Sequence, residues 1–131
     1  MKKPLRELTP SEWKIIRIIW QKEPCTAPDV QEKLEASTGW TYSTVRTLMD
    51  RMAAKGLLKT EKMRNLTLFR SAVRREDAQR GQLLQTLKNV FNGALTPMMQ
   101  CLLEAGDLSE KDLAEIEALI KSKRKSPKGK P

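Results

Sequence analysis

The sequence TYSTVRTLMDRM occupies residues 41–52 and predicts a helix with two contrasting faces. Apolar side chains recur at the spacing of one helical face, and they are Val45, Leu48, Met49 and Met52. The opposite face carries hydroxyl side chains near the start and basic ones further along, which suits hydrogen bonding with base edges in a DNA groove. The candidates for reading bases are Ser43, Thr44, Arg46 and Thr47. The alternative is an ordinary amphipathic helix with a solvated outer face.

Both ends of this helix carry residues that favour a helix boundary. Thr41 is a suitable N-cap, and Gly56 lies where a left-handed residue would end the last turn. The N-terminus of a helix attracts phosphate because its backbone N–H groups have no partner within the helix. We therefore expect Thr41 and Tyr42 to lie against the DNA backbone.

Two more helices are predicted upstream by a repeated start signal. The sequence TPSE at residues 9–12 supplies an N-cap, a proline at the first helical position and a capping-box glutamate. Leu8 and Trp13 flank this signal as a hydrophobic staple. Thr26 and Asp29 repeat the capping chemistry for the second helix. Three short helices at this spacing are typical of the helix-turn-helix motif.

A β-hairpin is predicted directly after the helix at residues 41–52. Its strands at residues 57–63 and 67–71 flank a short connection, in which Asn65 is expected to adopt the left-handed conformation of a hairpin tip. Lys62 and Arg64 place positive charge at this tip. The pattern predicts a winged helix-turn-helix, whose wing follows the DNA backbone and touches phosphate or the minor groove. The alternative is a surface hairpin with incidental charges.

Residues 73–122 predict about three helices that have too few residues to close a core by themselves. We expect a helical dimerisation domain, because a two-fold dimer would bury the apolar side chains and present two DNA-reading helices to a palindromic site. The candidates for the dimer interface are Leu84, Leu87, Phe91, Leu95, Met98, Met99, Leu102, Leu103, Leu113, Ile116 and Ile120. Alternatively, these helices fold back on the winged-helix domain of the same chain.

The predicted fold class is therefore mainly α with a small β-hairpin. A winged helix-turn-helix domain at residues 1–72 is followed by a C-terminal helical dimerisation arm at residues 73–122. Residues 123–131 are basic and almost free of apolar side chains, and they predict a disordered tail.

Charge is distributed unevenly along the chain. The sequence contains 25 Lys and Arg against 16 Asp and Glu, which gives a net charge of +9. Residues 1–71 carry 14 basic and 8 acidic side chains, whereas residues 72–120 carry 5 basic and 8 acidic ones. This separation favours a polyanion-binding module joined to a part with a different task.

Composition argues against catalysis and metal binding. The chain has no histidine, the commonest general base and metal ligand, and Cys25 and Cys101 match no zinc spacing. We expect no cofactor, no metal and no enzymatic activity. The two thiols are expected to be buried as small apolar groups, with a disulfide between them or a redox switch at Cys101 as alternatives. No apolar run approaches a membrane span, so we expect a cytoplasmic protein without membrane contact.

Several motifs occur together in one order along the chain. They are LTPSEW at residues 8–13, IW at 19–20, TVRTL at 44–48, RM at 51–52 and KGLL at 55–58. In this combination the sequence resembles the penicillinase-repressor family of the BlaI/MecI type, whose copper-responsive relatives of the CopY type share the same N-terminal half. The resemblance runs from Leu8 through Ser71 and continues more loosely to Ile120.

The resemblance implies a homodimeric repressor that binds a palindromic operator through a winged helix and dimerises through its C-terminal helices. It places base reading on Ser43, Thr44 and Arg46, where Ser43 stands in place of the lysine of some relatives. It also implies phosphate contacts, and these fall on Arg51, Lys55, Lys62 and Arg64.

Two features of the resembling family are absent from this sequence. Members that respond to β-lactams are cut by a regulatory protease at an Asn-Phe bond, and the corresponding position here is Gln100-Cys101. The copper-responsive members carry paired Cys-x-Cys motifs near the C-terminus, where this chain has none. The releasing signal is therefore not specified by the sequence.

The sequence thus predicts a homodimeric transcriptional repressor of double-stranded DNA. The helix at residues 41–52 would enter the major groove of a palindromic operator, the basic wing would lie on the backbone, and an unidentified signal would release the protein. The alternative is a winged-helix protein–protein adaptor, for which an apolar outer face on that helix would be the marker.

Overall fold

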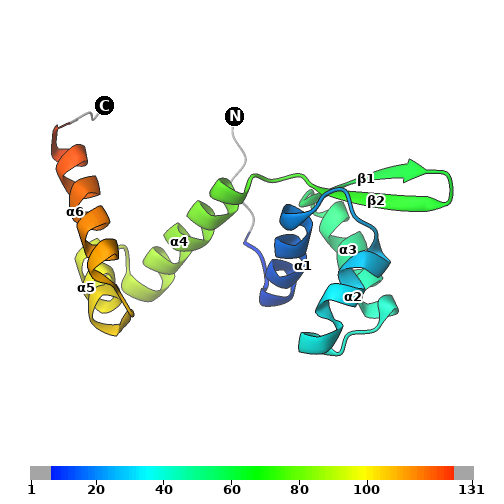
Figure 1. Ribbon diagram of the computed structural model, residues 1–131, viewed down its shortest axis with the longest axis horizontal. Coiled ribbons are helices and arrows are strands. Elements are labelled where there is room, and N and C mark those ends of the chain that lie inside the picture. Colours follow the sequence, from blue (N-terminus) through cyan, green and yellow to red (C-terminus); the bar gives the residue numbers. More distant parts are fainter. Residues whose placement is uncertain (1–6, 126–131) are drawn as a thin grey trace. The chain divides into compact units, whose positions relative to one another are not determined.

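The computed structural model describes residues 7–125 and shows a mainly helical chain with one two-stranded antiparallel hairpin (Figure 1). The elements are α1 (Pro10–Gln21), α2 (Ala27–Thr38), α3 (Tyr42–Ala54), β1 (Leu58–Met63), β2 (Leu66–Ser71), α4 (Arg75–Phe91), α5 (Leu95–Ala105) and α6 (Glu110–Lys125). This order confirms the predicted fold class. Among residues 7–125, no helix is long and apolar enough to cross a membrane.

The three helix starts of the N-terminal part follow the predicted capping chemistry. The Thr9 hydroxyl accepts a hydrogen bond from the Glu12 amide at 3.2 Å, and the Glu12 carboxylate accepts one from the Thr9 amide at 3.0 Å. Thr26 and Asp29 form the same reciprocal pair at the start of α2. These bonds satisfy amides that have no partner within the helix, so each start is determined by local sequence.

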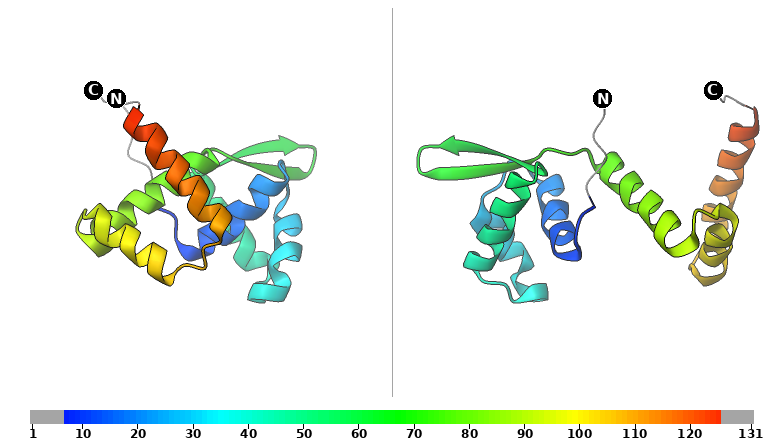
Figure 2. Two further views of the ribbon diagram at one scale, coloured as in Figure 1. Left: turned by 60° about the vertical axis from the view of Figure 1, so that its left-hand side comes forward. Right: turned by 180° about the vertical axis from the view of Figure 1, so that it is seen from behind.

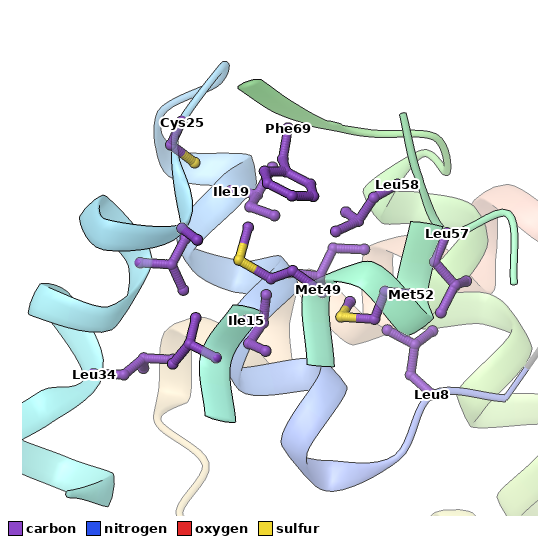
Figure 3. Packing of buried hydrophobic residues seen from close by; sticks show 14 of the residues in the cluster. Leu8, Ile15, Ile19, Cys25, Leu34, Met49, Met52, Leu57, Leu58 and Phe69 are labelled. Atoms are coloured by element: carbon purple, nitrogen blue, oxygen red, sulfur yellow. The ribbon is translucent and has the colours of Figure 1, made fainter. Parts of the chain in front are cut away.

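The core of the first unit lies between α1, α2, α3 and the hairpin (Figure 3). Its fully buried side chains come from all four elements, and they include Ile15, Ile16, Ile19, Val30, Val45, Met49, Met52 and Phe69. The apolar stripe predicted for α3 is confirmed, because Val45, Met49 and Met52 are fully buried and Leu48 is partly buried. Burial of this stripe leaves the opposite face of α3 free.

The hairpin pairs Leu58 with Ser71 and continues in register to Met63 and Leu66. Its tip extends beyond the three helices in Figure 1 and in the right-hand view of Figure 2. The connection holds two residues, and the left-handed one is Arg64, with φ at 59°. The prediction that Asn65 takes this conformation is wrong, because the second strand begins at Leu66 and the positive φ falls on the first residue of the shorter turn.

The base of the hairpin is fixed to the helices by backbone and side-chain bonds. The amide of Cys25 donates to the carbonyl of Phe69 at 3.1 Å, and the amide of Phe69 donates to the carbonyl of Cys25 at 2.8 Å. The indole N–H of Trp20 donates to the Ser71 hydroxyl at 2.9 Å. The hairpin is therefore anchored at its base, although its tip is exposed.

The chain divides into two units between Thr86 and Leu87, inside α4. The predicted boundary at residue 72 coincides with the end of the hairpin, and the first unit continues beyond it. Ala78 on α4 is buried, and the amide oxygen of Gln82 accepts a hydrogen bond from the Trp13 indole at 3.4 Å. The first part of α4 thus packs with the winged-helix core.

The second unit, described here over residues 87–125, has little core of its own. Met98 is the one buried side chain in that range. α6 begins with a capping box between Ser109 and Asp112 and continues to Lys125. The prediction of a disordered tail from residue 123 is therefore wrong for residues 123–125. Lys and Arg have high helix propensity there, and their positive charges interact favourably with the negative end of the helix dipole. The rest of that predicted tail lies outside the described residues.

The two cysteines lie in different surroundings, and both thiols are free. Cys25 is buried as predicted, whereas the prediction of a buried thiol is wrong for Cys101, which lies exposed on α5. Burial, followed by the carboxylates of Asp29 and Glu23, raises the pKa of the Cys25 thiol to about 11. Each of these effects penalises the thiolate.

We expect Cys25 to make stability fall at high pH. The unfolded thiol ionises near pH 9.0, whereas the folded thiol keeps its proton until about pH 11, so alkali favours the unfolded state between these values. Between pH 8 and pH 11, the free energy of unfolding should fall by about 2 kcal/mol more in the wild type than in Cys25→Ala. Urea titrations across this range, with a reductant present, measure the difference. Parallel pH profiles would contradict this account.

Candidate nucleic-acid interface

The outer face of α3 presents the hydroxyl residues that the sequence predicts for base reading. Ser43, Thr44 and Thr47 are all exposed. Thr41 is the N-cap, and its hydroxyl accepts a bond from the Thr44 amide and donates to the Thr44 hydroxyl, each at 3.2 Å. The hydroxyls of Ser43 and Thr47 lie on the same exposed face, so the first turns of α3 form a polar surface of short side chains.

Arg46 lies on this face but is held by the protein itself. Its Nε donates to both carboxylate oxygens of Asp50, at 3.1 and 3.3 Å, and its guanidinium carbon lies 5.7 Å from the centroid of the Phe69 ring. The Tyr42 hydroxyl, followed by the Asp50 carboxylate, raises the pKa of Arg46 above its usual value. The structure therefore places Arg46 where α3 meets β2.

The residues predicted to contact phosphate fall into two groups. Arg51 on α3 is exposed, as are Lys62 and Arg64 at the end of the hairpin. Lys55 is instead half-buried and donates to the carboxylate of Glu12, a buried acid in the capping box of α1. Because a buried carboxylate needs a partner, Lys55 neutralises Glu12 and links the end of α3 to the start of α1.

Asp50 is not among the residues to which the sequence gives a role. Its position four residues after Arg46 was the available signal, because side chains at this spacing are neighbours on a helix. The proximity of Phe69 to Arg46 could not be derived this way, because it depends on how the hairpin packs. Glu12 was recognised as a capping residue, while its pairing with Lys55 was not.

The residues predicted for a dimer interface are mostly exposed in the single chain. The exposed ones are Leu84, Leu95, Leu102, Leu103, Leu113 and Ile120. The partly buried ones are Leu87, Phe91, Met99 and Ile116. Met98 is buried within the chain itself, so it is not available to a second copy without rearrangement. The remaining residues are exposed or partly exposed apolar side chains on α4, α5 and α6, which a partner could cover.

The position that the sequence resemblance matched to a cleavage site lies inside α5. Gln100 and Cys101 are both exposed, and the Gln100 amide donates to the Glu104 carboxylate at 3.2 Å. Their peptide bond belongs to regular helix, so a protease would need α5 to unwind locally before it could cut there.

Comparisons with known proteins agree with this arrangement. The methicillin resistance regulatory protein MecI of Staphylococcus aureus strain N315 is 25% identical over 117 residues, which are 89% of this chain and 95% of MecI. The penicillinase repressor of Bacillus licheniformis is 21% identical over 126 residues, which are 96% of this chain and 98% of that repressor.

A solved structure shares the winged-helix fold. BlaI of Bacillus licheniformis, solved as a monomeric form in complex with the blaP half-operator, superposes with a TM-score of 0.50 at 22% identity. The match covers 59% of this chain and 93% of that one. The model of the penicillinase repressor family matches residues 8–122. The chain therefore belongs to the penicillinase repressor family of winged-helix, DNA-binding transcription regulators.

Proposed function

We propose that this chain is a dimeric transcriptional repressor that binds a palindromic operator, with α3 in the major groove and the hairpin along the backbone. The outer face of α3 carries this proposal, because exposed Ser43, Thr44 and Thr47 and the partly exposed Arg46 are all on this helix, outside its buried stripe. Hydroxyls and a guanidinium are the groups that recognise base edges in the major groove. BlaI, a relative with this fold, was solved in complex with a half-operator, which supports DNA binding by this chain.

The start of α3 is suited to hold a DNA phosphate. Thr41 already bonds the amide of Thr44, and within the described chain no partner is found for the amides of Tyr42 and Ser43. Free amides at a helix N-terminus bind anions. One phosphate at this end would orient α3 in the groove while the hydroxyl side chains meet the bases.

The hairpin supplies the second backbone contact. Lys62 and Arg64 are exposed at its end, and Arg51 adds a further cation on α3. Such contacts position a protein without reading sequence, and they make affinity fall steeply with salt. Lys55 contributes indirectly, because its bond to Glu12 fixes the end of α3 against α1.

The second unit supplies dimerisation in this proposal. The exposed leucines of α5 would be buried against a second copy, which would also bring a second α3 to the other half-site. We assign release of the repressor from DNA to a signal other than cleavage of an Asn-Phe bond. The resemblance matches that bond to Gln100 and Cys101 in this chain.

Substitution of two arginines separates base reading from backbone contact. Arg46→Ala should reduce discrimination between operator and random duplex by about 1–3 kcal/mol, because Arg46 is assigned to a guanine. Arg64→Ala should weaken both duplexes alike and reduce the salt slope by about one. Fluorescence anisotropy with both duplexes at several salt concentrations measures the two effects. Equal losses on both duplexes for Arg46→Ala would remove its base-reading role.

The operator itself can be found by selection. The full chain is mixed with random-sequence duplexes at physiological salt, and the bound fraction is sequenced. We expect enrichment of an inverted repeat. Salt-sensitive retention without an enriched motif would contradict sequence-specific repression, and a lack of retention would favour a protein–protein adaptor.

A further inference from the structure

The guanidinium of Arg46 is held from two sides before any DNA is bound. Asp50, one turn further along α3, accepts from its Nε through both carboxylate oxygens at 3.1 and 3.3 Å. The ring of Phe69, from β2, lies 5.7 Å from the guanidinium carbon. Phe69 is fully buried and bonded to Cys25 through both backbone groups, so this side of the site is rigid.

The bond to Asp50 determines which donors of Arg46 remain for DNA. A guanidinium has five N–H donors in a fixed fork, and Nε carries one of them. Asp50 engages Nε and the Tyr42 hydroxyl also interacts with the guanidinium, so the terminal amino groups carry the donors that remain for the two acceptors of guanine, O6 and N7. A guanidinium restrained in advance also loses less conformational freedom on binding, which improves recognition.

We propose that Asp50 is a positioning residue for base reading, which holds Nε of Arg46 so that the terminal amino groups face a guanine. This inference rests on the proposed function and specifies the base to which Arg46 is matched. A carboxylate on a DNA-facing surface repels phosphate and lowers affinity for every sequence. Asp50 thus increases discrimination between bases but lowers the affinity for DNA of any sequence.

The surroundings of Asp50 make it suitable for substitution. The side chain is 56% exposed, and Arg46 is 37% exposed, so the pair contributes little to folding. Asp50→Asn keeps the shape of the side chain, removes its charge and replaces one of the two oxygens that accept from Arg46 with an amino group that cannot accept. Effects of this variant on DNA binding can therefore be attributed to Arg46 and to the lost negative charge.

The experiment measures affinities of the full chain for its selected operator, for every single-base variant of that operator, and for random duplex. In Asp50→Asn, we expect discrimination at the guanine read by Arg46 to fall about tenfold, with other positions unchanged. Affinity for random duplex should stay the same or rise. Full wild-type discrimination at every position would overturn the proposal.

A matched control and a double mutant separate positioning from simple charge removal. Glu61→Gln also removes a carboxylate paired with an arginine, Arg70 at 3.8 Å, and should change all affinities alike without altering discrimination. In an Arg46→Ala background, Asp50→Asn should cause no further loss of discrimination. The same loss in both backgrounds would show that Asp50 acts independently of Arg46 and overturn the proposal. A wild type without any base preference would overturn the proposed function as well, whereas failure of Asp50→Asn alone leaves that function intact.

Discussion

Phe69→Ala is expected to lower the free energy of unfolding of the first unit by about 3–5 kcal/mol. The ring is fully buried in the core that also holds Ile19, Met49 and Leu58, as Figure 3 shows. Its removal leaves a cavity between α1, α3 and the base of the hairpin, and small domains have only about 5–15 kcal/mol of stability to lose. The hairpin should then detach from α3, and the surface that supports Arg46 should be lost with it.

Urea denaturation followed by tryptophan fluorescence measures this effect, because Trp13, Trp20 and Trp40 all pack against this core. Leu66→Ala provides the matched control on the same strand. Leu66 is 53% exposed at the hairpin tip, so its replacement should cost less than about 0.5 kcal/mol. A Phe69→Ala chain as stable as Leu66→Ala would mean that the hairpin does not pack on the helices.

The parts of this fold that could be predicted are those specified by neighbouring residues. The starts of α1 and α2 follow from capping pairs three residues apart, such as Thr9 with Glu12. The buried stripe of α3 follows from its helical spacing in the same way. Such features depend on a few adjacent residues, and tertiary packing left them unchanged.

The features that could not be predicted depend on contacts distant in sequence. The positive charge of Lys55 would suit a contact with phosphate. Its ammonium group is instead paired with the carboxylate of Glu12, which is distant in the sequence. The turn at Arg64 depends on where Phe69 fixes the strand register, rather than on the intrinsic preference of Asn65. The role inferred for Asp50 requires the Phe69 ring as well as the helical spacing from Arg46.

Leu102→Asp is expected to produce a folded monomer that binds the full operator at least about 100-fold more weakly. Leu102 is 50% exposed on α5, so the aspartate remains solvated in the single chain. In the proposed dimer the same carboxylate would be buried without a partner, which costs several kcal/mol. Loss of the second copy also removes the high effective concentration at which the second α3 meets its half-site, a factor of about 10²–10⁴ in avidity.

Sedimentation velocity and anisotropy on full and half operators measure the two consequences separately. Half-operator affinity should be unchanged, because Leu102 lies in the second unit and the DNA-binding residues lie in the first. Gln100→Asp is the control, since it adds the same charge to an exposed position on the same helix. Dimers that persist in Leu102→Asp would exclude this face of α5 from the interface. A monomer with undiminished affinity for the full operator would instead show that each winged helix binds its half-site without help from dimerisation.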